Sequence, residues 1–420
     1  MLAIFLTVFI DLLGFGILIP VFPLLISPGS PFRVTPEGWS FTQGLIMLGW
    51  LQAIFPFCIF IAAPILGQLS DRHGRKPVLA FSIFGTALGY ALFAIGISTA
   101  NIPLLFAARA LDGITGGNLA VAQAAIGDVS THENRAKNFG MLGAAFGLGF
   151  IIGPYLGGRL SSPDTSFYGL FHTPSWFGAT TPFWFATILA LANCASILTM
   201  FPETLKEKFH GGRIKISRAV SNVVGGFKSD RLRVVLMAGF LFSAGFTFFT
   251  TFFGVYLRNN FNFSSAKIGD YFAIVGLFIA ISQAVVVARV AKKLSDWKVL
   301  RFSMFGLGIM MLVYFVIPTT SSYLYLVIPF FTLFNGLTMA NMSSLISRSA
   351  EMGQQGQAMG IYSSVSSLAQ VPASILVGYI TSDITSSQPL FVSSACIILG
   401  GAVFFVLFKP KYVMESAHAE

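Results

Sequence analysis

The chain has 420 residues, of which 55% are hydrophobic and only 10% are charged. Soluble domains carry about 25% charged residues, so this composition excludes an ordinary soluble protein and predicts an integral membrane protein. The net charge of +10 at pH 7 does not indicate nucleic-acid binding, because the basic residues lie in short loops between apolar runs.

Twelve apolar runs follow one another along the chain, and each approaches the roughly 20 helical residues that a bilayer core requires. Runs this long and continuously apolar predict helices rather than β-barrel strands. The first run lacks the basic segment and cleavage site of a signal peptide, so we expect a membrane span there too. The predicted spans are 2–27, 43–67, 77–98, 102–127, 136–159, 181–202, 232–257, 268–290, 299–318, 322–346, 356–381 and 388–409.

Lys and Arg are unevenly divided between the two sides of the predicted membrane. Arg109 lies inside a span, and one side holds only Arg33, Arg159, Arg258 and Lys267 of the 26 basic residues. The others lie in loops on the opposite side. Because cytoplasmic loops carry the excess of Lys and Arg, both termini are predicted to be cytoplasmic.

A basic stretch over 206–233 divides the spans into two groups of six. We therefore expect an N-terminal bundle over 1–202, a cytoplasmic linker over 203–231 and a C-terminal bundle over 232–420. Four aliphatic residues in the linker favour a short amphipathic helix on the membrane surface, with a solvated linker as the alternative. These residues are Ile214, Ile216, Val220 and Val224.

The stretch GQLSDRHGRK at 67–76 concentrates charge between the second and third spans. It resembles the loop signature G-x-L-x-D-R-x-G-R-[KR] of the major facilitator superfamily. The matching residues are Gly67, Leu69, Asp71, Arg72, Gly74, Arg75 and Lys76. We expect Gly67 to let two helices approach closely and Gly74 to permit the tight turn. Asp71 is expected to meet the dipole at a helix end.

Arg72 and Arg75 are expected to pair with acids at neighbouring helix ends, and Asp128 at the end of span four is the candidate partner. The resemblance implies that this loop is a latch between the two halves of the protein in one conformation. The alternative is a plain basic hairpin. LSD recurs at 69–71 and 294–296, after the second and eighth spans, and these equivalent places support a six-span repeat.

A second signature, GMLGAAFGLGFIIGPYLGG at 140–158, lies in the fifth span. It resembles the antiporter signature of the same superfamily and so implies a proton-coupled exporter. The matching residues are Gly140, Gly149, Gly153, Pro154, Gly157 and Gly158. Small residues at this spacing form a flat face for close helix packing, and proline bends the helix. A generic small-residue helix interface is the alternative.

The segments 9–23 and 109–130 are similar to those of tetracycline/proton antiporters and their multidrug relatives, so the resemblance covers residues 1–160. It departs from the tetracycline exporters in the third span, where Gly89 stands at the place of their intramembrane acid. This departure puts tetracycline itself in question as the substrate.

Three ionisable residues lie at membrane depth, where charge is costly and indicates function. Asp11 is about 13 Å into the first span, and Arg109 and Asp112 are about 10 and 15 Å into the fourth. We expect Asp11, alone or together with Asp112, to carry a proton that competes with substrate, with Arg109 as a fixed charge. Arg109 and Asp112 could instead only neutralise each other, and Asp11 could form a structural hydrogen bond. The resemblance implies the functional alternative for Arg109 and Asp11.

Further polar residues in the spans are candidates to line the cavity or to join helices, and the sequence does not separate these alternatives. They are Gln52, Asn118, Gln123, Gln283, Asn335, Asn341 and Gln370.

The sequence thus predicts an all-α integral membrane protein, with 12 transmembrane helices in two six-helix bundles. We expect a monomeric transporter in the cell membrane that exports an amphiphilic or drug-like molecule by antiport with protons. Its partners would be substrate, protons and membrane lipids, with no cofactor, metal or nucleic acid. The alternative is a proton symporter or uncoupled carrier of a metabolite or lipid. An enzyme is not expected, since no metal-binding or nucleophile motif is present, and a non-transporting sensor is the other class considered.

Overall fold

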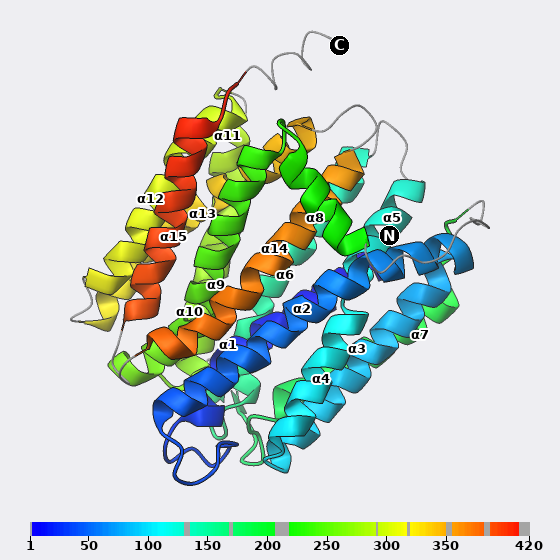
Figure 1. Cartoon of the computed structure of the whole chain (residues 1–420). Helices are drawn as coiled ribbons and strands as arrows, with labels where there is room; N and C mark the ends of the chain where they lie inside the picture. The colour runs from blue at the N-terminus through cyan, green and yellow to red at the C-terminus, as the bar shows by residue number, and fades with distance from the viewer. Residues whose placement is uncertain are drawn as a thin grey trace. The chain divides into compact units, whose positions relative to one another are not determined.

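The computed structural model describes residues 2–129, 135–167, 171–205, 218–290, 293–316, 320–349, 355–381 and 387–410 (Figure 1). This part of the chain is mostly α-helical. Its strands β1 (Ser166–Phe167) and β2 (Phe171–His172) pair antiparallel in a small hairpin.

The chain divides into two compact units. Unit 1 comprises Met1–Ile216 and Leu257–Ala273, and unit 2 comprises Ser217–Tyr256 and Ile274–Glu420.

Unit 1 is a helical bundle in which α1 packs along α6, while α3 packs against both α4 and α7. Figure 1 shows α2, α3, α4 and α7 side by side. Local signals fix the helix ends: the Ser40 hydroxyl and the Gln43 side chain form a capping box at the start of α2. The helices are α1 (Leu2–Ile26), α2 (Phe41–His73), α3 (Arg75–Ser98), α4 (Ile102–Thr115), α5 (Asn118–Val129), α6 (Arg135–Leu160) and α7 (Thr181–Met200).

Unit 2 contains a second set of helices, in which α12 packs against α13 and α15. The aromatic core of this unit joins Phe249 to Phe253, with ring centroids 4.5 Å apart, and Phe253 to Tyr314 at 5.0 Å. The helices are α8 (Arg218–Lys228), α9 (Arg233–Phe261), α10 (Ser265–Ile281), the π-helix η1 (Ser282–Val287), α11 (Ala288–Val290), α12 (Asp296–Val316), α13 (Ser321–Ser349), α14 (Gln355–Ile380) and α15 (Gln388–Leu407). The end of α9 and the first turns of α10 belong to unit 1.

Each predicted span coincides with helical structure. Ten helices of the described chain are long and apolar enough to cross a membrane. The other two spans correspond to α6 and to α4 with α5. The fourth span was predicted as one helix over 102–127, and this is wrong, because Gly116 and Gly117 form a turn between α4 and α5. The eighth span continues from α10 into the π-helix η1.

Part of the linker forms α8, which contains two of the aliphatic residues that predicted an amphipathic helix. Val220 is 56% exposed and Val224 is 45% exposed, while Val223 is buried. Ile214 and Ile216 lie outside the described residues. A helix is therefore present at 218–228, and its location on a membrane surface stays a prediction.

Candidate functional site

Two of the three predicted membrane charges form an ion pair inside unit 1. Arg109 and Asp112 lie one turn apart on α4, and Nη1 of Arg109 donates to Oδ2 of Asp112 across 2.9 Å. Their side chains are only 4% and 6% exposed. The guanidinium carbon lies 4.2 Å from the ring centroid of Phe55 on α2, within the range of a cation–π contact. The sequence spacing predicted this pairing, and the structure confirms the contact.

Arg109 retains hydrogen-bonding capacity beyond this pair. Its Nε and Nη2 groups are buried and make no hydrogen bond within the described part of the chain. A buried donor without a partner costs about 1–3 kcal/mol. These two groups are therefore available to an oxygen atom of a ligand.

Asp11 lies beside this pair, half-buried on α1. Its carboxyl group interacts electrostatically with Asp112, and the side-chain amide of Asn118 is within reach of it as a hydrogen-bonding group. Tyr90 of α3 reaches the same stretch of α1, where its hydroxyl donates to the carbonyl oxygen of Ile10 at 3.4 Å. The structure thus brings the three predicted residues together in one unit. Asp11, Arg109 and Asp112 are called the membrane charge cluster below.

Gly89 faces this cluster from α3. A Cβ atom at Gly89 would lie 3.1 Å from the Cβ of Asp112 and 3.3 Å from the carbonyl oxygen of Ala108. The space beside Gly89 is therefore occupied by the side chain of Asp112. The resemblance to tetracycline exporters implies an acid at the position of Gly89. In this chain, the carboxylate next to that position is Asp112 of α4.

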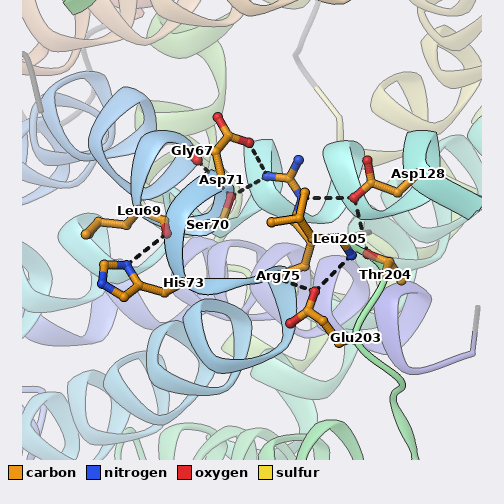
Figure 2. A network of polar contacts seen from close by, with 10 residues as sticks. All are labelled: Gly67, Leu69, Ser70, Asp71, His73, Arg75, Asp128, Glu203, Thr204 and Leu205. Atoms are coloured by element: carbon orange, nitrogen blue, oxygen red, sulfur yellow. Dashed lines mark hydrogen bonds and ion pairs between the residues drawn. The ribbon is translucent and has the colours of Figure 1, made fainter. Parts of the chain in front are cut away.

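Arg75 organises the charged hairpin between α2 and α3, as Figure 2 shows. Its side chain is 7% exposed. Nη1 donates to Oδ1 of Asp71 and to Oγ of Ser70, each at 2.6 Å, and Nε donates to Oδ2 of Asp128 at 3.0 Å. The Thr204 hydroxyl also donates to Oδ2 of Asp128, at 3.3 Å. The predicted contact between Arg75 and Asp128 is confirmed.

Glu203, which sequence reasoning missed, caps the first turn of α3 (Figure 2). Its Oε1 accepts from the N–H of Arg75 at 2.8 Å, and its Oε2 accepts from the N–H of Lys76 at 3.1 Å. Burial raises the pKa of the Glu203 carboxyl, but hydrogen bonds from backbone N–H groups, led by that of Leu205, outweigh it and leave the pKa below its usual range. The sequence signal that could have identified Glu203 was its place as an acid directly after the sixth predicted span.

The glycines of this hairpin differ from one another in function. Gly74 forms the predicted turn with φ at +107°, and a Cβ there would collide with Oε2 of Glu203. Gly67 lies within α2, which continues to His73, and a Cβ there would meet no atom of the described residues within 4 Å, so the predicted close helix approach at Gly67 is not seen within unit 1. Asp71 lies in the last turn of α2 and pairs with Arg75, so the dipole of α3 is met by Glu203 instead.

The glycines of α6 form the contact surface for α1. A Cβ at Gly149 would lie 2.6 Å from Cβ of Leu12, one at Gly153 would lie 2.8 Å from the Leu13 carbonyl oxygen, and one at Gly157 would lie 2.7 Å from that of Ile17. The three follow at four-residue intervals, so they share one helix face. Gly140 and Pro154 also lie in α6. The sequence signature therefore brings α6 against α1 next to Asp11.

The other end of α6 contacts the start of α10 within unit 1. A Cβ at Gly158 would lie 3.0 Å from the Cα of Gly269. One residue further, Nη2 of Arg159 donates to both carboxylate oxygens of Asp270 at 2.8 Å. Sequence reasoning missed this pair, although an acid in the first turn of a predicted span was a signal.

The candidate cavity residues of unit 1 are not equivalent. Gln52 and Asn118 are buried, and Oε1 of Gln52 and both amide atoms of Asn118 make no hydrogen bond of regular geometry with described residues. Gln123 is half-buried. Gln52 and Asn118 thus have unused polar atoms.

In unit 2, Asn341 donates to the carbonyl oxygen of Leu337 in its own helix at 2.7 Å. Asn335 is buried, and its Oδ1 has no partner among the described residues. Gln283 is exposed in η1, and Gln370 is half-buried. The structure therefore assigns Asn341 a helix-internal contact and leaves the other three as candidates.

The family model of the Major Facilitator Superfamily matches residues 4–374. The class H tetracycline resistance protein of Pasteurella multocida is 29% identical over 378 residues, which cover 89% of this chain and 86% of that protein. Multidrug resistance protein 1 of Bacillus subtilis (strain 168) is 27% identical, over 97% and 96% of the two chains. The crystal structure of the human organic anion transporter MFSD10 shares the fold, with a TM-score of 0.70 and 21% identity over 96% of this chain and 98% of that one.

Proposed function

Because the chain belongs to the Major Facilitator Superfamily, a family of multi-pass membrane transporters, we propose that it exports an amphiphilic, drug-like molecule in exchange for protons by alternating access. Its relatives include proteins of tetracycline and multidrug resistance, which supports efflux from the cell through the plasma membrane. The observation that supports proton coupling is the membrane charge cluster, in which two carboxylates, Asp11 and Asp112, lie in the same region of unit 1 as a single arginine.

The cluster has the composition that exchange requires. One ionised carboxylate is neutralised by Arg109, while Asp11 is only half-buried and is left with Asp112 as a like charge. A like charge in the neighbourhood disfavours simultaneous ionisation of the two carboxylates. Binding of a proton or of a positively polarised substrate group relieves the same repulsion, so each displaces the other.

Arg109 is the fixed charge in this account. Because Asp112 uses only Nη1, the buried Nε and Nη2 groups can donate to an oxygen of the substrate. The Phe55 ring beneath the guanidinium adds an apolar surface. An arginine, a carboxylate and an aromatic ring together suit an amphiphilic molecule that presents both polar and apolar groups.

The excess of Lys and Arg in these loops supports a cytoplasmic location for the hairpin of Arg75 and for both termini. There the Arg75 network would latch one conformation, and its ion pairs would separate in the other. Arg159 and Asp270 would then lie at the external end of unit 1, where their ion pair opposes separation of α6 and α10. Alternating access requires each end to open in turn.

Cells that express the chain provide the direct test. They should accumulate less of a fluorescent lipophilic cation than cells with the Asp11→Asn variant, and a protonophore should remove the difference. Equal accumulation in the two strains, or export that persists with the protonophore, would contradict proton-coupled efflux. Proton-dependent uptake would instead establish the symporter alternative.

A further inference from the structure

The fourth span contains a helix start within the membrane. α4 ends at Thr115, and the N–H of Gly116 donates to the Asp112 carbonyl oxygen at 2.6 Å. After Gly117, α5 begins with Asn118 and continues for 12 residues. The first N–H groups of a helix have no partner within it and carry the positive end of its dipole. Broken helices of this kind present such ends to anionic groups in other transporters.

Asn118 is an unsatisfied polar residue at this helix start. Asn118 is 0% exposed, and neither its Nδ2 nor its Oδ1 makes a hydrogen bond of regular geometry with a described residue. Buried amides nearly always have partners, so an unpaired one in a native protein requires an explanation. A partner that is bound in another state of the transport cycle provides one.

The carboxyl group of Asp11 is the candidate partner. α5 contacts α1, and the side chain of Asn118 acts on the Asp11 carboxyl. The two residues are also expected at similar depths. Asn118 lies 10 residues before Asp128, near the C-terminal end of α5, and Asp11 lies 9 residues after Leu2, the N-terminal end of α1.

The ionisable groups around Asp11 come from several helices. Asp112 and Arg109 are already bonded to each other, and the Tyr90 hydroxyl is directed to the backbone of α1. On the helices that pack against α1, the remaining ionisable side chains at membrane depth in the described chain are Cys58 on α2, Tyr155 on α6 and Cys194 on α7. None of these is a second cation, so neutral donors must stabilise an ionised Asp11.

We propose that Asn118, with the first N–H groups of α5, forms the site that holds Asp11 in both of its protonation states. The Nδ2 group donates to the carboxylate when Asp11 is ionised, and Oδ1 accepts from the carboxylic acid when a proton is bound. The proton itself passes to and from an oxygen of Asp11, and no other bond changes. Asn118 is thus a positioning residue, and this inference rests on the proposed coupling function of Asp11.

The experiment is an infrared difference titration of the purified protein, which follows the C=O stretch of protonated carboxyl groups against pH. Asp11→Asn identifies the signal of Asp11 by removing it. Asn118→Ala should move the midpoint of that signal upward by about one pH unit, a tenfold rise in proton affinity, because ionised Asp11 loses a charge-assisted hydrogen bond. Asn118→Ser, which keeps a donor, should give a smaller shift.

Asn193→Ala is the matched control. Asn193 is also a buried asparagine beside α1, but its Nδ2 donates to the Thr7 hydroxyl at 3.0 Å, one turn from Asp11. This variant should leave the midpoint unchanged. Melting temperatures of all variants separate an altered titration from unfolding.

An Asp11 midpoint that is identical in the wild type and in both Asn118 variants would overturn the proposal. So would an unchanged midpoint together with weaker substrate binding, which would show that the amide binds substrate instead. The titration requires no transport, so a shifted midpoint in a protein without proton exchange would support this inference while contradicting the proposed function.

Discussion

Asp112 lies beside Gly89, the position at which this chain departs from its resemblance to tetracycline exporters. Its side chain fills the space beside Gly89. If the position of the carboxylate matters more than the helix that carries it, the acid can be moved from α4 to α3.

Relocation of this acid is the first prediction. Asp112→Ala should reduce substrate-driven proton movement by at least about tenfold, which corresponds to 1.4 kcal/mol. The double variant Gly89→Asp with Asp112→Gly should restore part of it, because the two Cβ positions are 3.1 Å apart. Gly89→Asp alone should not support proton movement, since it places a second carboxylate side chain in the space that Asp112 occupies. A double variant as inactive as Asp112→Ala would contradict the account.

Glu203 permits a prediction about pH. Its pKa is lowered in the folded protein, so its contribution to stability is present above the unfolded value, about 4.3, and is lost as the pH falls through the folded value. Glu203→Gln should lower the melting temperature at neutral pH through a loss of about 1 kcal/mol, as for other helix caps. The difference from the wild type should shrink once the pH falls below the unfolded value and disappear below the lowered folded value. A difference that is independent of pH would exclude the charge of Glu203 as its cause.

Sequence reasoning reached some of these residues and not others. The pair of Arg109 and Asp112 was predictable because a helix brings i and i+3 together. Glu203 was not, because it is 128 residues from the N–H group of Arg75 that it accepts from. Only the tertiary fold brings a loop after α7 to the start of α3.

The contact between α1 and α6 is the clearest feature at the scale of elements. Glycines at four-residue intervals predicted a flat helix face, and the structure identifies its partner as α1. The break in span four could not be placed from hydropathy, because Gly116 and Gly117 do not interrupt an apolar run. The pair of glycines was the signal, since glycine lowers helix stability by up to about 1 kcal/mol per residue.

Two substitutions in α6 test this contact. Gly153→Ala should destabilise the protein by about 1–3 kcal/mol, because its Cβ would lie 2.8 Å from the Leu13 carbonyl oxygen. Gly147→Ala is the matched control in the same helix, since a Cβ there would meet no atom within 4 Å. Thermal unfolding in detergent measures both. Equal effects of the two substitutions would argue against close packing of α1 on this face.

At the scale of the whole molecule, the two units repeat one ion pair with its charges exchanged. In unit 1, Arg75 at the start of α3 pairs with Asp128 at the end of α5. In unit 2, Asp296 at the start of α12 pairs with Arg348 at the end of α13, at 3.3 Å. The LSD at 69–71 precedes Arg75, and the LSD at 294–296 ends with Asp296 itself. These sequences already suggested a repeat, but the exchange of charges required the structure.

The burial of the two arginines predicts unequal effects. Arg75 is 7% exposed, whereas Arg348 is 63% exposed. Arg75→Ala should cost about 2 kcal/mol, because it leaves several acceptors without a donor. Arg348→Ala should cost at most about 1 kcal/mol, as for other surface ion pairs. Similar melting temperatures for the two variants would contradict this ranking.

Proton exchange itself is the central claim, and purified protein in liposomes tests it most directly. With a pH gradient imposed and lumenal pH recorded, lipophilic drugs are added to the wild type, Asp11→Asn and Asp112→Asn. The account predicts substrate-dependent proton movement in the wild type that is lost in at least one of the two variants. Movement of substrate without any proton flux would contradict it and leave an uncoupled carrier.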